Sequence, residues 1–227
     1  MGRDHRFRRL KTIVYSQTDQ KEPTMPQPPH ADVRGFLPDD EGLQLYQWAL
    51  AATAVGPLLE IGSYCGRSTI WLGQAAQARQ TAVFAIDHHR GSEEHQIGES
   101  HHDAELVNAD GLFDTFAAFR RNIAQARLEQ VVIPIVADSK QFASHWAGPL
   151  SVVFIDGGHS LDAALADYRL WAPRIGPGGI LAIHDVFPDP ADGGQAPFTI
   201  WRLAQQSGLF ASEGTQGSLR ALRRLAD

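Results

Sequence analysis

Acidic and histidine side chains follow two apolar runs in the second half of the chain. Asp156 ends one run and His159 lies three residues beyond it, while His184 and Asp185 end the other run. Carboxylates and imidazoles are common ligands of divalent metal ions. A neutral imidazole can also take a proton from a hydroxyl group near pH 7. These residue types predict a reaction in which a base or a metal ion helps to deprotonate an oxygen or nitrogen nucleophile.

A glycine-containing turn after an earlier apolar run predicts a nucleotide site. The run ends with Glu60, the turn contains Gly62, Ser63 and Gly66, and the following helix begins with hydroxyl residues that include Ser68. Because the glycines carry no Cβ, the backbone can pass close beneath a ligand at both positions. Open parallel sheets bind ligands beyond the carboxyl ends of their strands, so these five residues are candidates for cofactor binding.

Two further apolar runs end in acids that suit the parts of a nucleoside. Asp87 ends the run after the glycine turn and is followed by His88. A carboxylate there can accept hydrogen bonds from both hydroxyls of a ribose. Asp138 and Ser139 end the next run, where an acid or a hydroxyl can meet the exocyclic amine of an adenine. We therefore include all four residues among the candidate cofactor contacts.

The elements that must position these residues alternate as in an α/β protein. Short apolar runs predict strands at 58–61, 82–86, 131–136, 152–155 and 180–183. Amphipathic stretches predict helices near 67–79, 112–127, 139–146, 160–172 and 197–207, with another that begins at Asp39 and Asp40. Alternating segments at 208–213 and 218–224 predict a terminal hairpin. We expect a Rossmann-like, open, mostly parallel seven-stranded sheet with helices on both faces and a C-terminal antiparallel hairpin.

The glycine turn also separates two classes of nucleotide-binding fold. A dinucleotide site would need Gly-x-Gly-x-x-Gly, but Tyr64 and Arg67 occupy the second and third glycine positions, so NAD is the weaker expectation. The pattern of an acid, a glycine two residues later and a second glycine four residues beyond resembles the first motif of class I S-adenosylmethionine-dependent methyltransferases. The resemblance extends over residues 40 to 225. It implies S-adenosyl-L-methionine as the cofactor, with the later acids at its ribose and adenine.

The strand-end pairs resemble those of small-molecule O-methyltransferases of the catechol and macrolide-sugar types. In these families, acids that end the fourth and fifth strands hold a magnesium ion, which binds two substrate oxygens. The resemblance makes Asp156 and Asp185 the metal ligands, with His184 beside them, and Asp156 also a catalytic residue. His159 stands where catechol-type enzymes have a lysine, and we expect it to be the catalytic base. Histidine suits Zn, Mn or Fe better than Mg, so the divalent ion stays open among Mg, Mn and Zn.

Other roles for these residues remain open at the level of sequence. His159 could cap the following helix, and His184 could satisfy a buried backbone carbonyl. Asp156 could bind the methionine amine of the cofactor, or a water molecule, in a metal-free site. Two other functions are also compatible with the residues: a methyltransferase-like, metal-dependent hydroxylase of a biosynthetic pathway, and a protein that binds S-adenosylmethionine without turnover.

Two polar loops are expected to form the walls of the active site. The first spans about 88–111, contains five of the ten histidines and is too long for a minimal connection. We expect it to close over cofactor and acceptor, with Arg90 and the histidines binding polar groups. A second metal site, although the histidine spacing matches no closed metal motif, and a solvated loop without a role are the alternatives. The second loop, at about 187–196, follows Asp185. Their polarity favours a sugar or another hydroxylated natural product as the acceptor.

Composition and charge limit the partners. The net charge of −6 and the pI near 5.9 disfavour nucleic acid, and no apolar run is long enough to span a membrane. The lone Cys65 cannot form an intramolecular disulfide, and the sequence has no secretory signal, so we expect a cytoplasmic protein. Residues 1–38 predict a flexible N-terminal arm, with Met25 as an alternative start, and 39–227 predict one domain. A small-molecule acceptor is the expected partner, and a homo-oligomer is compatible with the sequence.

Overall fold

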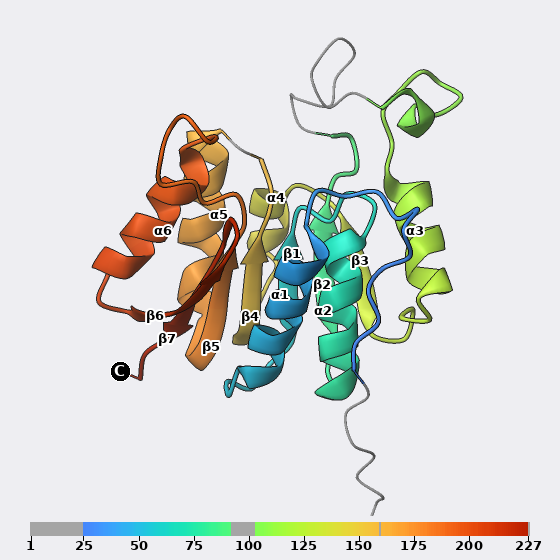
Figure 1. Ribbon diagram of the computed structural model, residues 1–227. Coiled ribbons are helices and arrows are strands. Elements are labelled where there is room, and N and C mark those ends of the chain that lie inside the picture. Colours follow the sequence, from blue (N-terminus) through green and yellow to red (C-terminus); the bar gives the residue numbers. More distant parts are fainter. Residues whose placement is uncertain (1–24, 92–102, 159, 227) are drawn as a thin grey trace, which may run out of the picture.

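Seven strands form one sheet within the described part of the chain. The computed structural model describes residues 25–91, 103–158 and 160–226, and Figure 1 shows their arrangement. The strands are β1 (Leu58–Ile61), β2 (Val83–Asp87), β3 (Val132–Val136), β4 (Leu150–Ile155), β5 (Ile175–Ile183), β6 (Phe210–Gln216) and β7 (Leu219–Arg224). Their order is β3-β2-β1-β4-β5-β7-β6, with β7 antiparallel to both of its neighbours. The predicted Rossmann-like sheet with a C-terminal antiparallel hairpin is confirmed.

Helices cover both faces of this sheet. They are α1 (Asp39–Ala51), α2 (Arg67–Ala78), α3 (Phe116–Gln125), α4 (Ser139–Ala143), α5 (Leu161–Trp171) and α6 (Ala196–Gln206). Residues of α1, α2 and α3 pack against the strands in one apolar cluster, and residues of α4, α5 and α6 pack in a second cluster. Successive side chains of β1 point to opposite faces of the sheet, so Leu58 belongs to the first cluster and Leu59 to the second. Among the described residues, no helix combines the length and the hydropathy needed to cross a bilayer.

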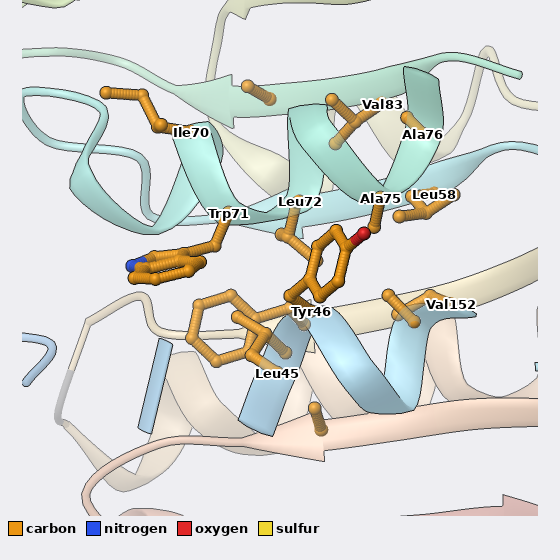
Figure 2. Close-up of a cluster of buried hydrophobic side chains, with 14 of the residues drawn as sticks. Leu45, Tyr46, Leu58, Ile70, Trp71, Leu72, Ala75, Ala76, Val83 and Val152 are labelled. Atoms are coloured by element: carbon orange, nitrogen blue, oxygen red, sulfur yellow. The ribbon is translucent and has the colours of Figure 1, made fainter. Parts of the chain in front are cut away.

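Close packing between α1 and α2 fixes the position of the first helix. Figure 2 shows Tyr46 of α1 in the same cluster as Trp71 and Leu72 of α2. Gly42 permits the close approach, because a Cβ at this position would stand 2.1 Å from Nε1 of Trp71. The same helix turn carries Glu41, so this packing also fixes the position of that carboxylate.

The strand β5 begins five residues earlier than the sequence predicts. Glycine and proline in the stretch 176–179 normally weaken a strand, which is why the prediction began at 180. In the structure Ile175 pairs with Leu150, and a bulge after this pair shifts the register. A Cβ on Gly179 would stand 2.8 Å from the carbonyl oxygen of Ser151. The glycines therefore allow the two backbones to approach rather than ending the strand.

The later part of the predicted N-terminal arm packs on the domain. Val33 and Leu37 are buried in the core, and both of their carbonyl oxygens accept hydrogen bonds from the Arg67 guanidinium, at 3.1 and 2.8 Å. The prediction of a flexible arm is therefore wrong for residues 33–37, because two apolar side chains are buried there. Residues 1–24 lie outside the described part of the chain.

Candidate active site

A cavity of about 870 Å³ opens at the carboxyl ends of the parallel strands. Its walls come from the β1–α2 turn, the residues that follow β2, β3 and β4, and the segment after β5. The predicted cofactor residues in its lining are Gly62, Ser63, Ser68, Asp87, His88, Asp138, Ser139 and Asp156. Glu60 and Gly66 were also predicted to contact the cofactor, but neither belongs to the lining.

The two glycines of the β1–α2 turn allow close contacts inside the protein. Gly62 has a φ of +86°, and a Cβ there would stand 2.1 Å from the carbonyl oxygen of Asp156. Gly66 is the N-cap of α2 with a φ of +91°, and a Cβ there would meet the ring of Phe119. Both conformations are unfavourable for other residue types. Gly66 therefore allows the shape of the turn itself. Gly62 allows the turn to lie close to the end of β4.

Glu60 lies behind this turn and braces it from within. Its side chain is 0% exposed, and Oε2 accepts a hydrogen bond from the hydroxyl of Thr69. Burial raises the pKa of Glu60 to about 7, although hydrogen bonds from Ser68, Thr69 and Ser63 oppose the increase. The predicted cofactor contact is thus corrected: Glu60 links β1 to the first turn of α2.

Asp87 organises the same turn while it faces the cavity. Its Oδ2 accepts hydrogen bonds from the backbone N–H groups of Ser63 and Tyr64 at 2.9 and 2.8 Å, and its Oδ1 accepts one from that of His89 at 2.7 Å. A carboxylate offers about four acceptor positions. Hydrogen bonds within the described part of the chain use three of them, so Asp87 keeps capacity for one ribose hydroxyl rather than both. His88 lies next to it in the cavity lining.

Asp138 and Ser139 connect β3 to α4 at the cavity wall. Oδ1 of Asp138 accepts hydrogen bonds from the backbone of Lys140 at 2.8 Å and Gln141 at 3.3 Å, so this residue caps α4. The hydroxyl of Ser139 accepts a hydrogen bond from Nε1 of Trp171 at 2.8 Å. Both residues are therefore held rigidly by local hydrogen bonds beside the cavity.

Asp167 of α5 is a lining residue that the sequence analysis did not single out. Burial raises the pKa of its carboxyl to about 6; the hydrogen bond to Ser139 opposes this increase and the charge of Asp138 adds to it. A signal was present in the sequence, because Asp167 lies three residues after Ala164 and four before Trp171, both of which are buried. Helical spacing therefore placed this acid on the buried face of α5.

The three predicted metal ligands converge at the ends of β4 and β5. Nδ1 of His184 lies 3.0 Å from Oδ1 of Asp156 and 3.6 Å from Oδ1 of Asp185. One ligand atom from each of the three lies within 4.8 Å of the others. Asp185 has a φ of +55°, a left-handed conformation that stores backbone strain and is typical of functional positions. On the far side of the imidazole, Nε2 of His184 lies 2.7 Å from Oε2 of Glu41.

Carboxylates control the charge of His184. Burial lowers the pKa of its imidazole, but the charge of Asp156 and the hydrogen bonds to Asp156 and Glu41 outweigh burial, so the pKa is raised. The alternative that His184 satisfies a backbone carbonyl is wrong, because both ring nitrogens contact carboxylate oxygens. Glu41 was missed by the sequence analysis as a partner in this cluster.

The predicted base, His159, lies outside the described residues. The N-cap of α5 is the next residue, Ser160, whose hydroxyl accepts a hydrogen bond from the backbone N–H of Ala163 at 3.3 Å. In the first predicted loop, residues 92–102 also lie outside the described part, while His88 and Gly91 line the cavity.

Two further segments contribute to the cavity lining: the second predicted loop and residues 35–37, which the sequence analysis did not single out. Phe187 and Asp192 of the predicted loop 187–196 belong to the lining. Phe36, from the segment buried against the core, also lines the cavity with 58% of its surface exposed, and its ring centroid lies 5.6 Å from that of Tyr64. Arg34 beside it forms ion pairs with two acids of the segment 103–105. Phe36, Phe187 and Asp192 therefore bring aromatic and acidic side chains to the cavity lining.

A family model described as a methyltransferase domain matches residues 59–186, which make up more than half of the chain. The chain belongs to this methyltransferase family. The predicted resemblance to class I methyltransferases is confirmed.

Solved structures share the fold of this methyltransferase. The O-methyltransferase NovP superposes with a TM-score of 0.64 at 15% identity, over 82% of this chain and 80% of that chain. TomG from Streptomyces achromogenes, an O-methyltransferase of tomaymycin synthesis in complex with S-adenosylmethionine, gives 0.56 at 16% identity, over 86% and 83%. An O-methyltransferase from Bacillus cereus, in complex with SAH, gives 0.56 at 19% identity, over 83% and 84%.

The residues of the methyltransferase fit both a nucleoside-containing ligand and a divalent ion. A volume of about 870 Å³ lies within the range of about 300–1,000 Å³ that is usual for small-molecule sites. Asp87 lines the cavity, and a carboxylate there can accept a hydrogen bond from a ribose hydroxyl. Two carboxylates and one imidazole with closely spaced ligand atoms suit first-row divalent ions as well as magnesium.

Proposed function

We propose that this methyltransferase transfers the methyl group of S-adenosyl-L-methionine to a hydroxyl of a small molecule, a sugar-containing compound or another hydroxylated natural product. The main support is that Asp87, Asp138, Asp156 and Asp185 all line one cavity. In the sheet, β1 and β4 lie between β2, which ends with Asp87, and β5, which is followed by Asp185. A donor held at its nucleoside by the first two acids can therefore present its sulfonium end toward Asp156.

Methyl transfer sets the requirements for the remaining residues. The acceptor oxygen forms a bond to the methyl carbon while the bond from that carbon to the sulfonium sulfur breaks, and the hydroxyl proton passes to a base. We assign the base role to His159 and the positioning of the acceptor to Asp156 and Asp185. A divalent ion of the Mg, Mn or Zn type, bound by Asp156, His184 and Asp185, would supply positive charge that makes the acceptor hydroxyl more acidic.

The lining residues on the acceptor side support a hydroxylated substrate with an apolar face. Asp185 and Asp192 offer acceptors for hydroxyl groups, while Phe36 and Phe187 offer apolar surface. The hydroxylase alternative is less well supported, because the described cluster has one histidine and two carboxylates. Oxygen-activating iron sites more often use two histidines and one carboxylate.

Binding and transfer can be tested directly. Isothermal titration should give micromolar-range affinity for S-adenosylmethionine, and labelled methyl donor should transfer to members of a panel of hydroxylated natural products. Asp156→Asn should lower the transfer rate by about 100-fold or more, because the proposal places this carboxylate at the metal ion and the acceptor hydroxyl. Asp110→Asn, at an exposed position, is the matched control. Absence of any affinity for S-adenosylmethionine would remove the basis of the proposal.

A further inference from the structure

Glu41 is a buried acid in an unusual position for the first turn of a helix. Only 4% of its surface is exposed, although α1 begins two residues earlier at the surface with Asp39 and Asp40. A carboxylate without hydrogen bonds would be costly to bury there, so its partners explain its presence. It does not belong to the cavity lining, which means that it acts on the site only through other residues.

Three elements meet at this carboxylate. Its Oε2 lies 2.7 Å from Nε2 of His184, at the end of β5. Its Oε1 accepts hydrogen bonds from the backbone N–H of Ser218 at 2.6 Å and from its hydroxyl at 3.2 Å. Gly217 leaves room for this contact, because a Cβ there would stand 2.1 Å from Oε1. The turn between β6 and β7 therefore holds Glu41 from one side while Glu41 holds His184 on the other.

The same turn also braces the segment that carries Asp185. The backbone N–H of Val186 donates to the carbonyl oxygen of Ser218 at 3.0 Å. Ser218 thus fixes both Glu41 and the residue that follows Asp185. The side chains divide by exposure as well: Asp156 and Asp185 are 20% and 27% exposed, whereas those of His184 and Glu41 are almost fully buried. The two aspartates face the cavity, and the other two residues support them from the protein interior.

A carboxylate oxygen accepts hydrogen bonds, so the contact of Glu41 with Nε2 requires a proton on that nitrogen, and the contact of Asp156 with Nδ1 requires one there in the absence of a metal ion. A metal ion bound by Asp156 and Asp185 would replace the proton on Nδ1 and leave the one on Nε2. The other nitrogen, Nδ1, is then directed at Asp156 and Asp185. Histidines that bind metals commonly donate their second N–H to a carboxylate, which sets the tautomer and the direction of the ring. We propose that Glu41 is the positioning residue of the metal centre, holding His184 so that Nδ1 is the ligand atom; this inference rests on the metal ion of the proposed function.

Manganese titration of the purified protein tests the inference. Glu41→Gln keeps the side-chain shape but removes the charge, and its amide can donate as well as accept, so the tautomer of His184 is no longer fixed. We expect Mn²⁺ affinity to fall by about 10- to 100-fold, with S-adenosylmethionine affinity changed less than about twofold and activity recovered at saturating Mn²⁺. Asp40→Asn is the matched control, since Asp40 accepts a hydrogen bond from Gln216 of β6 at 2.8 Å without contacting His184.

The outcomes separate this inference from the proposed function. If the wild-type protein binds S-adenosylmethionine but no Mn²⁺, the metal part of the proposed function fails and the inference fails with it. If Mn²⁺ binds the wild-type and Glu41→Gln proteins equally, the inference is overturned and the metal site stands. Equal loss of metal and S-adenosylmethionine affinity would also overturn it, because a general structural role would then explain both.

A measurement on the unaltered protein covers the case in which Glu41→Gln does not fold. With ¹⁵N-labelled histidine, long-range proton–nitrogen spectra report which ring nitrogen carries the proton. On addition of Zn²⁺ we expect one histidine to keep its proton on Nε2 while the Nδ1 resonance shifts. A shift of Nε2 in its place would exclude the proposed arrangement.

Discussion

Replacing Glu60 by glutamine should change how the stability of the protein depends on pH. The carboxyl is fully buried against Thr69, and burial raises its pKa from the usual 4.5 to about 7. Glutamine has nearly the same shape and keeps an oxygen that can accept the Thr69 hydroxyl, but it does not titrate. The difference in unfolding free energy between the two proteins therefore isolates the ionisation of this one side chain.

The magnitude follows from proton binding in the folded and unfolded states. The unfolded chain releases this proton near pH 4.5, whereas the folded protein keeps it until about pH 7. Between these values the folded state binds more protons, so the stabilising contribution that is fully present below pH 4.5 is lost as the pH rises through 7. A separation of about 2.5 pH units corresponds to about 3 kcal/mol. The unfolding free energy of the wild-type protein should fall by this amount as the pH rises from below 4.5 to above 7, whereas that of Glu60→Gln should not.

Urea unfolding, followed by tryptophan fluorescence between about pH 5 and 8, measures the difference. The unfolding free energy of Glu60→Gln relative to wild type should rise by about 2 to 3 kcal/mol over this interval, because a small part of the contribution is already lost at pH 5. Glu129→Gln, at an exposed position, controls for the loss of one formal charge. A difference that stays constant within about 0.5 kcal/mol would refute the reasoning, since Glu60 would then titrate alike in both states.

Three further substitutions test the turn, the helix packing and the acceptor side. Gly62→Ala places a Cβ 2.1 Å from the Asp156 carbonyl at a φ of +86°, and should weaken S-adenosylmethionine binding by about tenfold or more in a calorimetric titration; unchanged affinity would contradict the close approach. Gly42→Ala overpacks against Trp71, and should lower the unfolding free energy by about 1–3 kcal/mol in urea; a neutral effect would mean that α1 can move away. Phe36→Ala should raise the KM for the acceptor by about fivefold while S-adenosylmethionine affinity stays within about twofold, and the reverse pattern in steady-state kinetics and titration would assign Phe36 to the cofactor.

The residues at the strand ends could be predicted because their position depends on local sequence. Buried parallel strands appear as continuous apolar runs, and the first acid after each run marks the carboxyl end of the strand. Asp87, Asp138 and Asp156 were found in this way, and all three line the cavity. The rule does not indicate whether such an acid faces the cavity or the protein interior. Glu60 was therefore assigned to the cofactor, although its side chain is fully buried behind the turn.

Glu41 could not be predicted by the same reasoning. An acid in the first turn of a helix is usually explained by the helix dipole and by solvent, and nothing nearby in sequence marks it as buried. Its partner His184 lies 143 positions away, and Ser218 lies 177 positions away. Such contacts depend on how the whole sheet is assembled. Asp167 is different, because helical spacing already indicated its burial.

The contact between Glu41 and the β6–β7 turn has a consequence for synthesis of the protein on the ribosome. The first helix of the domain carries the acid, yet the group that holds its Oε1 belongs to the last hairpin. Strands β1 to β5 can emerge and pair while Glu41 still lacks Ser218. Translation that stops within the hairpin therefore releases a chain with most of its sheet, but with the imidazole of His184 contacting an acid whose Oε1 lacks its hydrogen bonds from Ser218.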